Sequence, residues 1–269
     1  MKIGNRDFQI GRHTYVMGIL NVTPDSFSDG GCFRKKDKAL YRVEEMLKEG
    51  MDILDIGGES TRPGYTMLSE EEELGRVLPV IEAIKARFEV PISLDTYKGK
   101  VAQAGIEAGV DMINDIWGLQ YDEDMARIIA QSALPCCLMH NRKDTAYQDF
   151  MADIKTDLIK TFKLAKSAGI ARENIILDPG VGFAKSYEQN LQVINRLEEF
   201  KCFEMPLLLG CSRKSVIGLT LDLPTQERLE GTLVTTVLAV MKGCSFVRVH
   251  DIKENVRAIR MAEAIMESL

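Results

Sequence analysis

The sequence predicts a single (β/α)8 TIM barrel, a ring of eight parallel strands surrounded by helices, with a short hairpin at its N-terminus. Short apolar runs alternate with amphipathic stretches along the 269 residues, and the alternation repeats eight times without a Pro- or Gly-rich linker. Strict alternation of strand and helix gives a parallel sheet, and eight strands close it into a barrel. Because such barrels use roughly 250 residues, we expect residues 1–269 to form one domain.

The eight apolar runs have the composition of strands buried on both faces. They cover residues 15–20, 53–56, 91–94, 112–114, 136–139, 175–177, 207–209 and 246–249. The amphipathic stretches that follow them are the expected helices, at residues 37–49, 69–87, 98–108, 122–131, 150–168, 187–199, 226–241 and 253–267. Residues 1–14 precede the first strand and are expected to form a hairpin over the closed end of the barrel.

Periodicity and end signals support the expected helices. Apolar residues in the second one recur at steps of three and four, at Val77, Val80, Ile81 and Ile84. Ser69 is a good N-cap, and the acidic residues after it suit the positive end of a helix dipole. A glycine suited to the left-handed position after a helix follows three of the stretches, at Gly50, Gly109 and Gly169.

An open doubly wound sheet is the alternative architecture. It would place a glycine-rich GxGxxG turn after the first strand, and residues 17–21 read MGILN instead. A second candidate phosphate loop, GVGFAKS at residues 180–186, has Ala184 where a P-loop needs glycine before its lysine. The missing GxGxxG turn favours the closed barrel, and residues 180–186 are interpreted as a flexible strand-to-helix turn.

Composition and charge exclude several classes of protein. The chain carries 34 basic and 40 acidic residues, for a net charge of −6, which argues against a nucleic-acid partner. No run approaches 18 apolar residues, so no membrane span is expected. The N-terminus lacks the apolar core of a secretory signal, and the six cysteines show no CxxC spacing. These features indicate a cytoplasmic protein with reduced thiols.

A polar residue or a basic loop follows each predicted strand. The series is Asn21, Asp55, Asp95, Asn114 with Asp115, His140, Asp178, Gly210 leading into Ser212–Arg213–Lys214–Ser215, and Arg248 with His250. Active sites of (β/α)8 barrels lie at the carboxyl ends of the strands, so we expect a polar pocket there. Two long loops, residues 21–31 and 57–64, are rich in Gly, Pro and hydroxyl groups and are expected to cover it. The three histidines fit no zinc spacing, so no structural metal is expected.

Two long motifs resemble the dihydropteroate synthases. Residues 17–31 read MGILNVTPDSFSDGG and residues 54–64 read LDIGGESTRPG, which are similar to the first and second signatures of that family. Shorter matches follow in the family's order as far as residue 251. The resemblance implies a (β/α)8 barrel, a homodimer and a transferase of folate biosynthesis. That family joins p-aminobenzoate to 6-hydroxymethyl-7,8-dihydropterin diphosphate and releases pyrophosphate.

The resemblance also implies which residues bind the pterin. The pterin has a flat guanidine-like edge, to which an ionised carboxylate can bind through two parallel hydrogen bonds, and Asp178 is given that role. Lys214 would donate to the pterin carbonyl and ring nitrogen, and Arg248 would stack on the ring. The implied pterin-binding residues are Asp95, Asn114, Met139, Asp178, Lys214 and Arg248.

The resemblance also implies which residues bind the metal ion, the diphosphate and the p-aminobenzoate. Asn21 is implied as the Mg²⁺ contact, through an amide oxygen that suits this hard cation. The diphosphate would be bound by Asn21, Thr61, Arg62, Arg248 and His250. Arg248 and His250 stand two residues apart on a strand, so both point to one face. The p-aminobenzoate would be bound by Pro24, Phe27, Thr61, Pro63, Phe183 and Ser215.

The implied catalytic residues are Asp95, Lys214, Arg248 and His250. Because the amine of p-aminobenzoate is neutral at pH 7, no strong general base is needed. We therefore expect a dissociative order, in which diphosphate leaves first and a pterin-methyl cation forms beside Asp95. The benzoate carboxylate would rest at a helix N-terminus near Ser215.

Three other functions remain open at this stage. A methyltransferase of the methyltetrahydrofolate–corrinoid type shares the barrel but should lack the two long loop motifs. A Schiff-base lyase on the same fold could use Lys214 as its nucleophile. A barrel that binds pterin without turnover is the third alternative, and an assay of pyrophosphate release would distinguish it.

Overall fold

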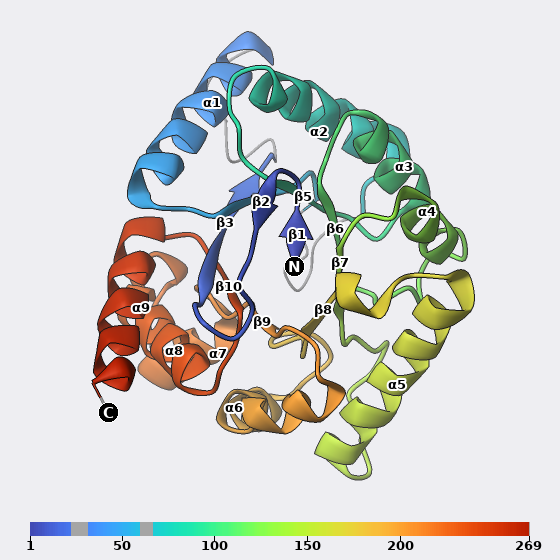
Figure 1. Cartoon of the computed structure of the whole chain (residues 1–269). Helices are drawn as coiled ribbons and strands as arrows, with labels where there is room; N and C mark the ends of the chain where they lie inside the picture. Colours follow the sequence, from blue (N-terminus) through green and yellow to red (C-terminus); the bar gives the residue numbers. More distant parts are fainter. Residues whose placement is uncertain (23–31, 60–66, 269) are drawn as a thin grey trace.

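A ring of eight parallel strands forms the centre of the molecule (Figure 1). The computed structural model describes residues 1–22, 32–59 and 67–268. The strands are β3 (Tyr15–Asn21), β4 (Ile53–Gly57), β5 (Ile92–Asp95), β6 (Met112–Asp115), β7 (Cys136–Met139), β8 (Ile175–Asp178), β9 (Leu208–Leu209) and β10 (Phe246–Val249). They pair in the order β8-β7-β6-β5-β4-β3-β10-β9. A parallel bridge between Leu177 and Leu207 joins β8 to β9 and closes the ring. The predicted barrel is therefore confirmed.

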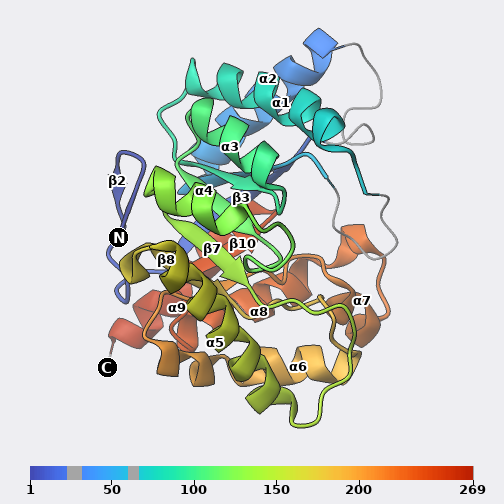
Figure 2. The same cartoon turned by 90° about the vertical axis from the view of Figure 1, so that its right-hand side faces the viewer.

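Helices surround this ring on the outside (Figures 1 and 2). Their bounds are α1 (Cys32–Glu49), α2 (Glu70–Lys85), α3 (Gly99–Glu107), α4 (Met125–Ser132), α5 (Phe150–Ala168), α6 (Tyr187–Asn195), α7 (Ser215–Leu221), α8 (Leu229–Met241) and α9 (Ile252–Glu267). Ser69 caps α2 in a reciprocal capping box with Glu72, as its position predicted. The three predicted glycines have φ values of 101° at Gly50, 94° at Gly109 and 92° at Gly169.

The helices differ from the sequence prediction mainly in four places. The first begins at Cys32 rather than at residue 37, and the sixth ends at Asn195 and gives way to a 3-10 helix over Leu197–Phe203. An additional short helix, α7, precedes α8; it begins at Ser215, where a helix N-terminus was expected. The fourth begins at Met125 because Asp122 accepts hydrogen bonds from the backbone N–H groups of Gly99 (2.7 Å) and Asp124 (2.9 Å), which holds this residue in the preceding loop.

The N-terminal hairpin closes one end of the barrel. Its antiparallel strands β1 (Lys2–Ile3) and β2 (Arg6–Asp7) lie across the barrel axis in Figure 1 and at the end away from α7 in Figure 2. Apolar side chains of the hairpin and of the strands fill this end: Ile3, Phe8, Met17, Ile53, Met112, Cys137, Ile176, Leu208 and Phe246. No helix in the described ranges has an apolar stretch long enough to span a membrane.

Strand register gathers the polar residues at the opposite end. Neighbouring Cα partners are Asn21 with Gly57, Gly57 with Asp95, and Asp95 with Asn114, so these positions form a row around the mouth. Side chains on a strand alternate between its two faces. In β3, Met17, Ile19 and Asn21 therefore share the inner face, with Met17 at the closed end and Ile19 and Asn21 nearer the open one. Position along this inner face separates the apolar floor from the polar mouth: Met112, Cys137 and Ile176 belong to the floor, and Asn114, Met139 and Asp178, two residues later on the same strands, line the cavity.

Candidate active site

The carboxyl ends of the strands enclose a cavity of about 210 Å³. Every predicted site residue in the described part of the chain lines this cavity: Asn21, Asp95, Asn114, Met139, Asp178, Phe183, Lys214, Ser215, Arg248 and His250. Five further residues given roles by the resemblance lie outside the described residues: Pro24, Phe27, Thr61, Arg62 and Pro63. The structure thus brings together side chains spread over more than 220 positions of the sequence.

Two buried carboxylates, Asp55 and Asp95, bind the guanidinium of Arg248. Its Nε lies 2.6 Å from Asp55 Oδ2, and its Nη2 lies 2.5 Å from Asp95 Oδ2. Asn114 Nδ2 approaches Asp55 Oδ2 at 3.4 Å, a long hydrogen bond. Burial disfavours the charged form of Arg248, but Asp55 and Asp95 outweigh this effect and raise its pKa. The arginine is therefore a permanent cation.

Asp95 is the titratable member of this cluster. Its side chain is 8% exposed, and burial raises its pKa to about 7, although Arg248 acts in the opposite direction. Removing a carboxylate from water favours its neutral form, and a nearby cation favours the ionised one. Asp95 therefore loses its proton near neutral pH, and its ionised form would stabilise a positive charge that develops beside it.

Asp178 and Lys214 are a second acidic and basic residue in the lining of the cavity. Asp178 Oδ1 accepts a hydrogen bond from Gly180 N at 2.7 Å, and Lys214 Nζ donates to the carbonyl of Val181. Asp178 Oδ2 and Lys214 Nζ both face Gly210, at 3.5 and 3.9 Å from where a Cβ would stand there. Burial raises the pKa of Asp178 and lowers that of Lys214, so each group needs a partner to remain charged.

The aromatic wall of the cavity lies next to this lysine. Lys214 Nζ lies 4.7 Å from the centroid of the Phe183 ring, within cation–π distance. Phe183, Ile116 and Met139 belong to one apolar cluster, which gives a flat ligand an apolar surface between the charged groups. The cavity therefore suits a planar molecule with a polar edge.

His250 is held by Ser212, a residue to which the sequence analysis gave no role. Ser212 Oγ lies 3.0 Å from His250 Nδ1 and accepts a hydrogen bond from the backbone N–H of His250 at 3.2 Å. Arg213 next to it is paired with Asp251. These contacts fix the imidazole on the rim, two residues beyond Arg248.

Side-chain oxygens of Asn21 and Asp95 both lie near Gly57, and the Asp95 oxygen also pairs with Arg248. Their Oδ1 and Oδ2 atoms lie 3.8 and 3.7 Å from where a Cβ would stand at Gly57. Mg²⁺ usually takes one or two protein oxygens and completes its shell with water and substrate phosphates. Within the described ranges, no group of three or more His, Cys, Asp or Glu side chains could hold a metal ion. The donor set fits a Mg²⁺ that arrives with a phosphate ligand.

Several residues of the site had no role assigned from the sequence. Asp55 was recognised as a strand-end residue only; it does not line the cavity but holds Arg248, and its position two residues before Gly57 on the inward face of β4 was a usable signal. Glu59, Ser212, Arg213, Thr225 and Arg228 line the cavity. Thr225 and Arg228 come from the α7–α8 connection, where no sequence motif marks them.

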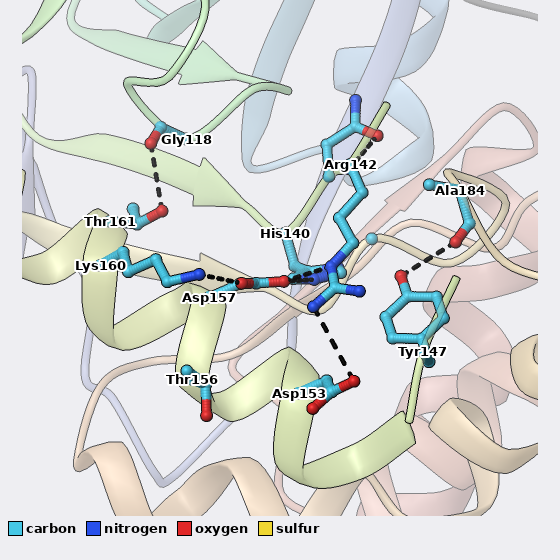
Figure 3. A network of polar contacts seen from close by, with 12 residues as sticks. Gly118, His140, Arg142, Tyr147, Asp153, Thr156, Asp157, Lys160, Thr161 and Ala184 are labelled. Carbon is cyan, nitrogen blue, oxygen red and sulfur yellow. Dashed lines mark hydrogen bonds and ion pairs between the residues drawn. The ribbon is translucent and has the colours of Figure 1, made fainter. Parts of the chain in front are cut away.

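Two of the strand-end residues do not contribute to the mouth. His140 is 2% exposed and its ring contacts Asp157 of α5 (Figure 3), while Asp115 accepts hydrogen bonds from the backbone of Trp117 and Leu119. The expectation that each strand-end polar residue lines the pocket is wrong for both. Met139 and Asn114 face inward, so the residues that follow them point outward.

The family model of pterin-binding enzymes matches residues 17–250. The chain belongs to the pterin-binding enzyme family. Its curated relatives include the dihydropteroate synthase of Clostridium beijerinckii, 58% identical over 99% of both chains. The dihydropteroate synthase of Bacillus subtilis is 53% identical over 94% of this chain and 89% of its own length.

Solved structures agree with this assignment. The dihydropteroate synthase from Clostridium difficile, crystallised in the presence of pteroic acid, has a TM-score of 0.94 and 50% identity over 96% of this chain and 99% of that chain. The Yersinia pestis enzyme in complex with a sulfonamide drug has a TM-score of 0.93 and 43% identity over 99% of each chain. The resemblance to dihydropteroate synthases is therefore confirmed, and with it a transferase function.

Proposed function

We propose that the cavity catalyses the condensation of 6-hydroxymethyl-7,8-dihydropterin diphosphate with p-aminobenzoate, giving 7,8-dihydropteroate and pyrophosphate for folate biosynthesis. The observation that carries this proposal is the presence of two buried carboxylates, Asp95 and Asp178, and two partly buried cations, Arg248 and Lys214, around one cavity. A pterin that loses a polyanionic leaving group needs both kinds of charge.

Asp178 is placed to bind the guanidine-like edge of the pterin. Gly180 N already fixes one of its oxygens, and a bidentate N–H pair from the ligand would hold the carboxylate ionised. Asn114 can both donate and accept at the same edge, and Met139 supplies apolar contact. Lys214, which faces the same space above Gly210, would donate to the pterin carbonyl and ring nitrogen.

The diphosphate would lie at the rim, where Arg248 and His250 face the cavity. Asn21 would hold Mg²⁺ together with substrate oxygens, and Thr61 and Arg62 would complete this site. When bound, Mg²⁺ spreads the negative charge of the departing diphosphate. Arg248 neutralises part of the same charge and stays protonated throughout, because Asp55 and Asp95 raise its pKa.

Asp95 would stabilise the cationic pterin methylene once the C–O bond to the diphosphate breaks and the electron pair leaves with the diphosphate. The amine of p-aminobenzoate then forms the new C–N bond and gives its proton to solvent. Phe183 and Ser215 would position the benzoate ring and carboxylate, together with Pro24, Phe27, Thr61 and Pro63. No strong base is required, since the amine is already neutral.

We also propose that residues 1–269 act as one cytoplasmic domain in a homodimer, without a nucleic-acid or membrane partner. Apolar side chains with large exposed fractions on α7, α8 and α9 support a contact with a second copy: Leu219, Val234, Met241, Met261 and Ile265. Light scattering of the purified protein tests this state. A mass of 30.1 kDa, that of one chain, would contradict it.

The decisive experiment for the reaction uses purified protein, Mg²⁺ and the pterin diphosphate, with and without p-aminobenzoate. Dihydropteroate and pyrophosphate are quantified together by chromatography and a coupled assay. We expect equimolar release of both products only when p-aminobenzoate is present at steady state. Binding of the pterin without either product would show a pterin-binding barrel instead.

A further inference from the structure

We propose that Lys185 is a positioning residue that acts from behind the pocket wall, in partnership with His140. In this role it fixes the turn of residues 180–183, and through this turn the ring of Phe183 and the anchor of Lys214. The inference rests on the proposed function, since it assigns p-aminobenzoate and pterin contacts to the wall that Lys185 holds. Lys185 does not line the cavity within the described part of the chain.

The ammonium of Lys185 has three acceptors, one for each of its protons. Its Nζ lies 2.8 Å from the carbonyl oxygen of Gly180, 3.0 Å from that of Phe183 and 3.0 Å from His140 Nδ1. An ammonium group offers three donors and no acceptor. A single partly buried side chain therefore joins the two ends of the turn to the residue that follows strand β7.

This arrangement defines the tautomer of His140. Below the pKa of Lys185, which burial lowers to about 7, its ammonium can only donate; Nδ1 then accepts, and the ring proton is on Nε2, which lies 3.3 Å from Asp157 Oδ2. Burial and the charge of Lys185 lower the pKa of His140 to about 3, so the imidazole is neutral. A neutral histidine thus separates a cation on the turn from an anion on α5.

Helix α5 holds the outer end of this chain of contacts (Figure 3). Asp157 accepts from Arg142 Nε at 2.5 Å and from Lys160 Nζ at 2.9 Å, so its carboxylate is ionised. Tyr147, whose ring packs under the Arg142 guanidinium, donates to the carbonyl of Ala184 at 2.9 Å. The residue that follows the turn, Ala184, is therefore also tied to the loop between β7 and α5.

The opposite side of the same turn contacts the substrate pocket. Val181 supplies the carbonyl that accepts from Lys214, and Phe183 packs against the same ammonium. Gly180 has a φ of 73°, and a Cβ there would lie 2.0 Å from the carbonyl oxygen of His140. The backbone of the turn therefore packs closely against the backbone of His140, just after β7. Two lysines hold it, Lys185 from behind and Lys214 from the pocket.

Two variants of Lys185 and one control variant distinguish a role in positioning the pocket wall from a role in overall stability. Lys185→Met keeps the length of the side chain and removes all three hydrogen bonds. Lys185→Arg keeps the charge, and Lys155→Met is the matched control because Lys155 pairs with Glu199 on the outer side of α5, away from the cavity. We expect Lys185→Met to raise the KM for p-aminobenzoate by about tenfold with a smaller change in kcat. Lys185→Arg should restore part of this loss, and Lys155→Met should match wild type.

A double-mutant cycle with Phe183→Ala identifies the route of the effect. If Lys185 acts through the Phe183 ring, Lys185→Met adds less than about twofold to the KM in the Phe183→Ala background. Equal effects in both backgrounds, or kinetics of Lys185→Met like those of Lys155→Met, would overturn the proposal. Failure of wild-type protein to make dihydropteroate would instead count against the proposed function.

A spectroscopic measurement on wild-type protein covers the case in which Lys185→Met does not fold. The chain has only three histidines, so ¹⁵N-labelled imidazoles can be assigned with His13→Gln and His140→Gln variants. We expect His140 to be the neutral Nε2–H tautomer between about pH 6 and pH 5, where Lys185, whose pKa burial lowers to about 7, carries its charge. An imidazolium or an Nδ1–H tautomer at about pH 5.5 would refute the contact with a charged Lys185.

Discussion

Asp95 and Arg248, 153 residues apart in the chain, form a buried ion pair with Oδ2 and Nη2 2.5 Å apart. The pair joins the end of β5 to that of β10, across the mouth of the barrel. It places a carboxylate for a developing cation beside a guanidinium for a departing anion. The two charges that must separate in the proposed reaction are thus matched by two charges that are already paired.

Asp95→Asn should slow the release of diphosphate itself. The amide cannot balance the charge of the pterin-methyl cation, so we expect single-turnover release to fall by about 100-fold or more. Rapid-quench measurement of pyrophosphate checks this. Asp111→Asn, which alters a carboxylate paired with Lys85 away from the cavity, is the control. If release kept its wild-type rate while only coupling to the amine failed, the dissociative order would be wrong.

The pH dependence of kcat/KM should show an acid limb near pH 7. Burial raises the pKa of Asp95 to about 7, and the proposed role needs the ionised form. Activity is therefore retained above this pKa and falls by about tenfold per pH unit well below it. The residual activity of Asp95→Asn should lack the limb, whereas Asp178→Asn should keep it. A wild-type limb that begins only below pH 5 would contradict this assignment.

Asp178→Asn should weaken binding of pteroic acid. The variant loses a charge-assisted bidentate contact, which corresponds to about 2 kcal/mol or roughly 30-fold in Kd. Calorimetric titration with pteroic acid measures the loss directly and without turnover. Asp124→Asn, an exposed substitution before α4, serves as control. Unchanged affinity in Asp178→Asn would remove this residue from the pterin site.

Removal of Mg²⁺ should stop turnover and leave product binding intact. Asn21 presents its amide oxygen to the space where the diphosphate would lie, whereas pteroic acid carries no phosphate. We expect EDTA to abolish product formation without changing the Kd for pteroic acid. Asn21→Ala should raise the Mg²⁺ concentration for half-maximal activity by about tenfold. Full activity of wild-type protein in EDTA would exclude a metal requirement.

Lys98→Met should destabilise the fold near the second loop. Lys98 Nζ lies 2.6 Å from both Glu59 and Glu73, and its side chain is 6% exposed. Its loss leaves two buried carboxylates without their cation, at a cost of about 3–5 kcal/mol in the free energy of unfolding. Urea denaturation measures this. Lys100→Met, an exposed neighbour, should have no effect.

The loss in Lys98→Met should also depend on pH. Burial raises the pKa of Glu73, and removal of Lys98 raises it further because the favourable charge is gone. Protonation then neutralises the stranded carboxyl group, so the destabilisation should be larger at pH 8 than at pH 5. A loss that is the same at both pH values would show that packing, not charge, is responsible.

The sequence by itself determined the barrel and most of the mouth. Strands buried on both faces are largely apolar, so their boundaries could be predicted from the sequence. The observed bounds of β7, β10 and α5 are those that were predicted. The position directly after such a strand is the first at which a polar side chain is tolerated. For this reason Asn21, Asp95, Asn114 and Asp178 could be placed together from the order of residues alone.

Only the tertiary structure decided how these side chains pair. Asp55 accepts a hydrogen bond from Arg248, which lies 193 residues later in the chain. The two residues meet because β4 and β10 lie on either side of β3 in the closed sheet. His140 and Lys185 meet behind the pocket because the alternation of side chains turns His140 outward, where the loop after β8 reaches it. Such contacts depend on register and loop path over long separations, and local sequence carries no signal for them.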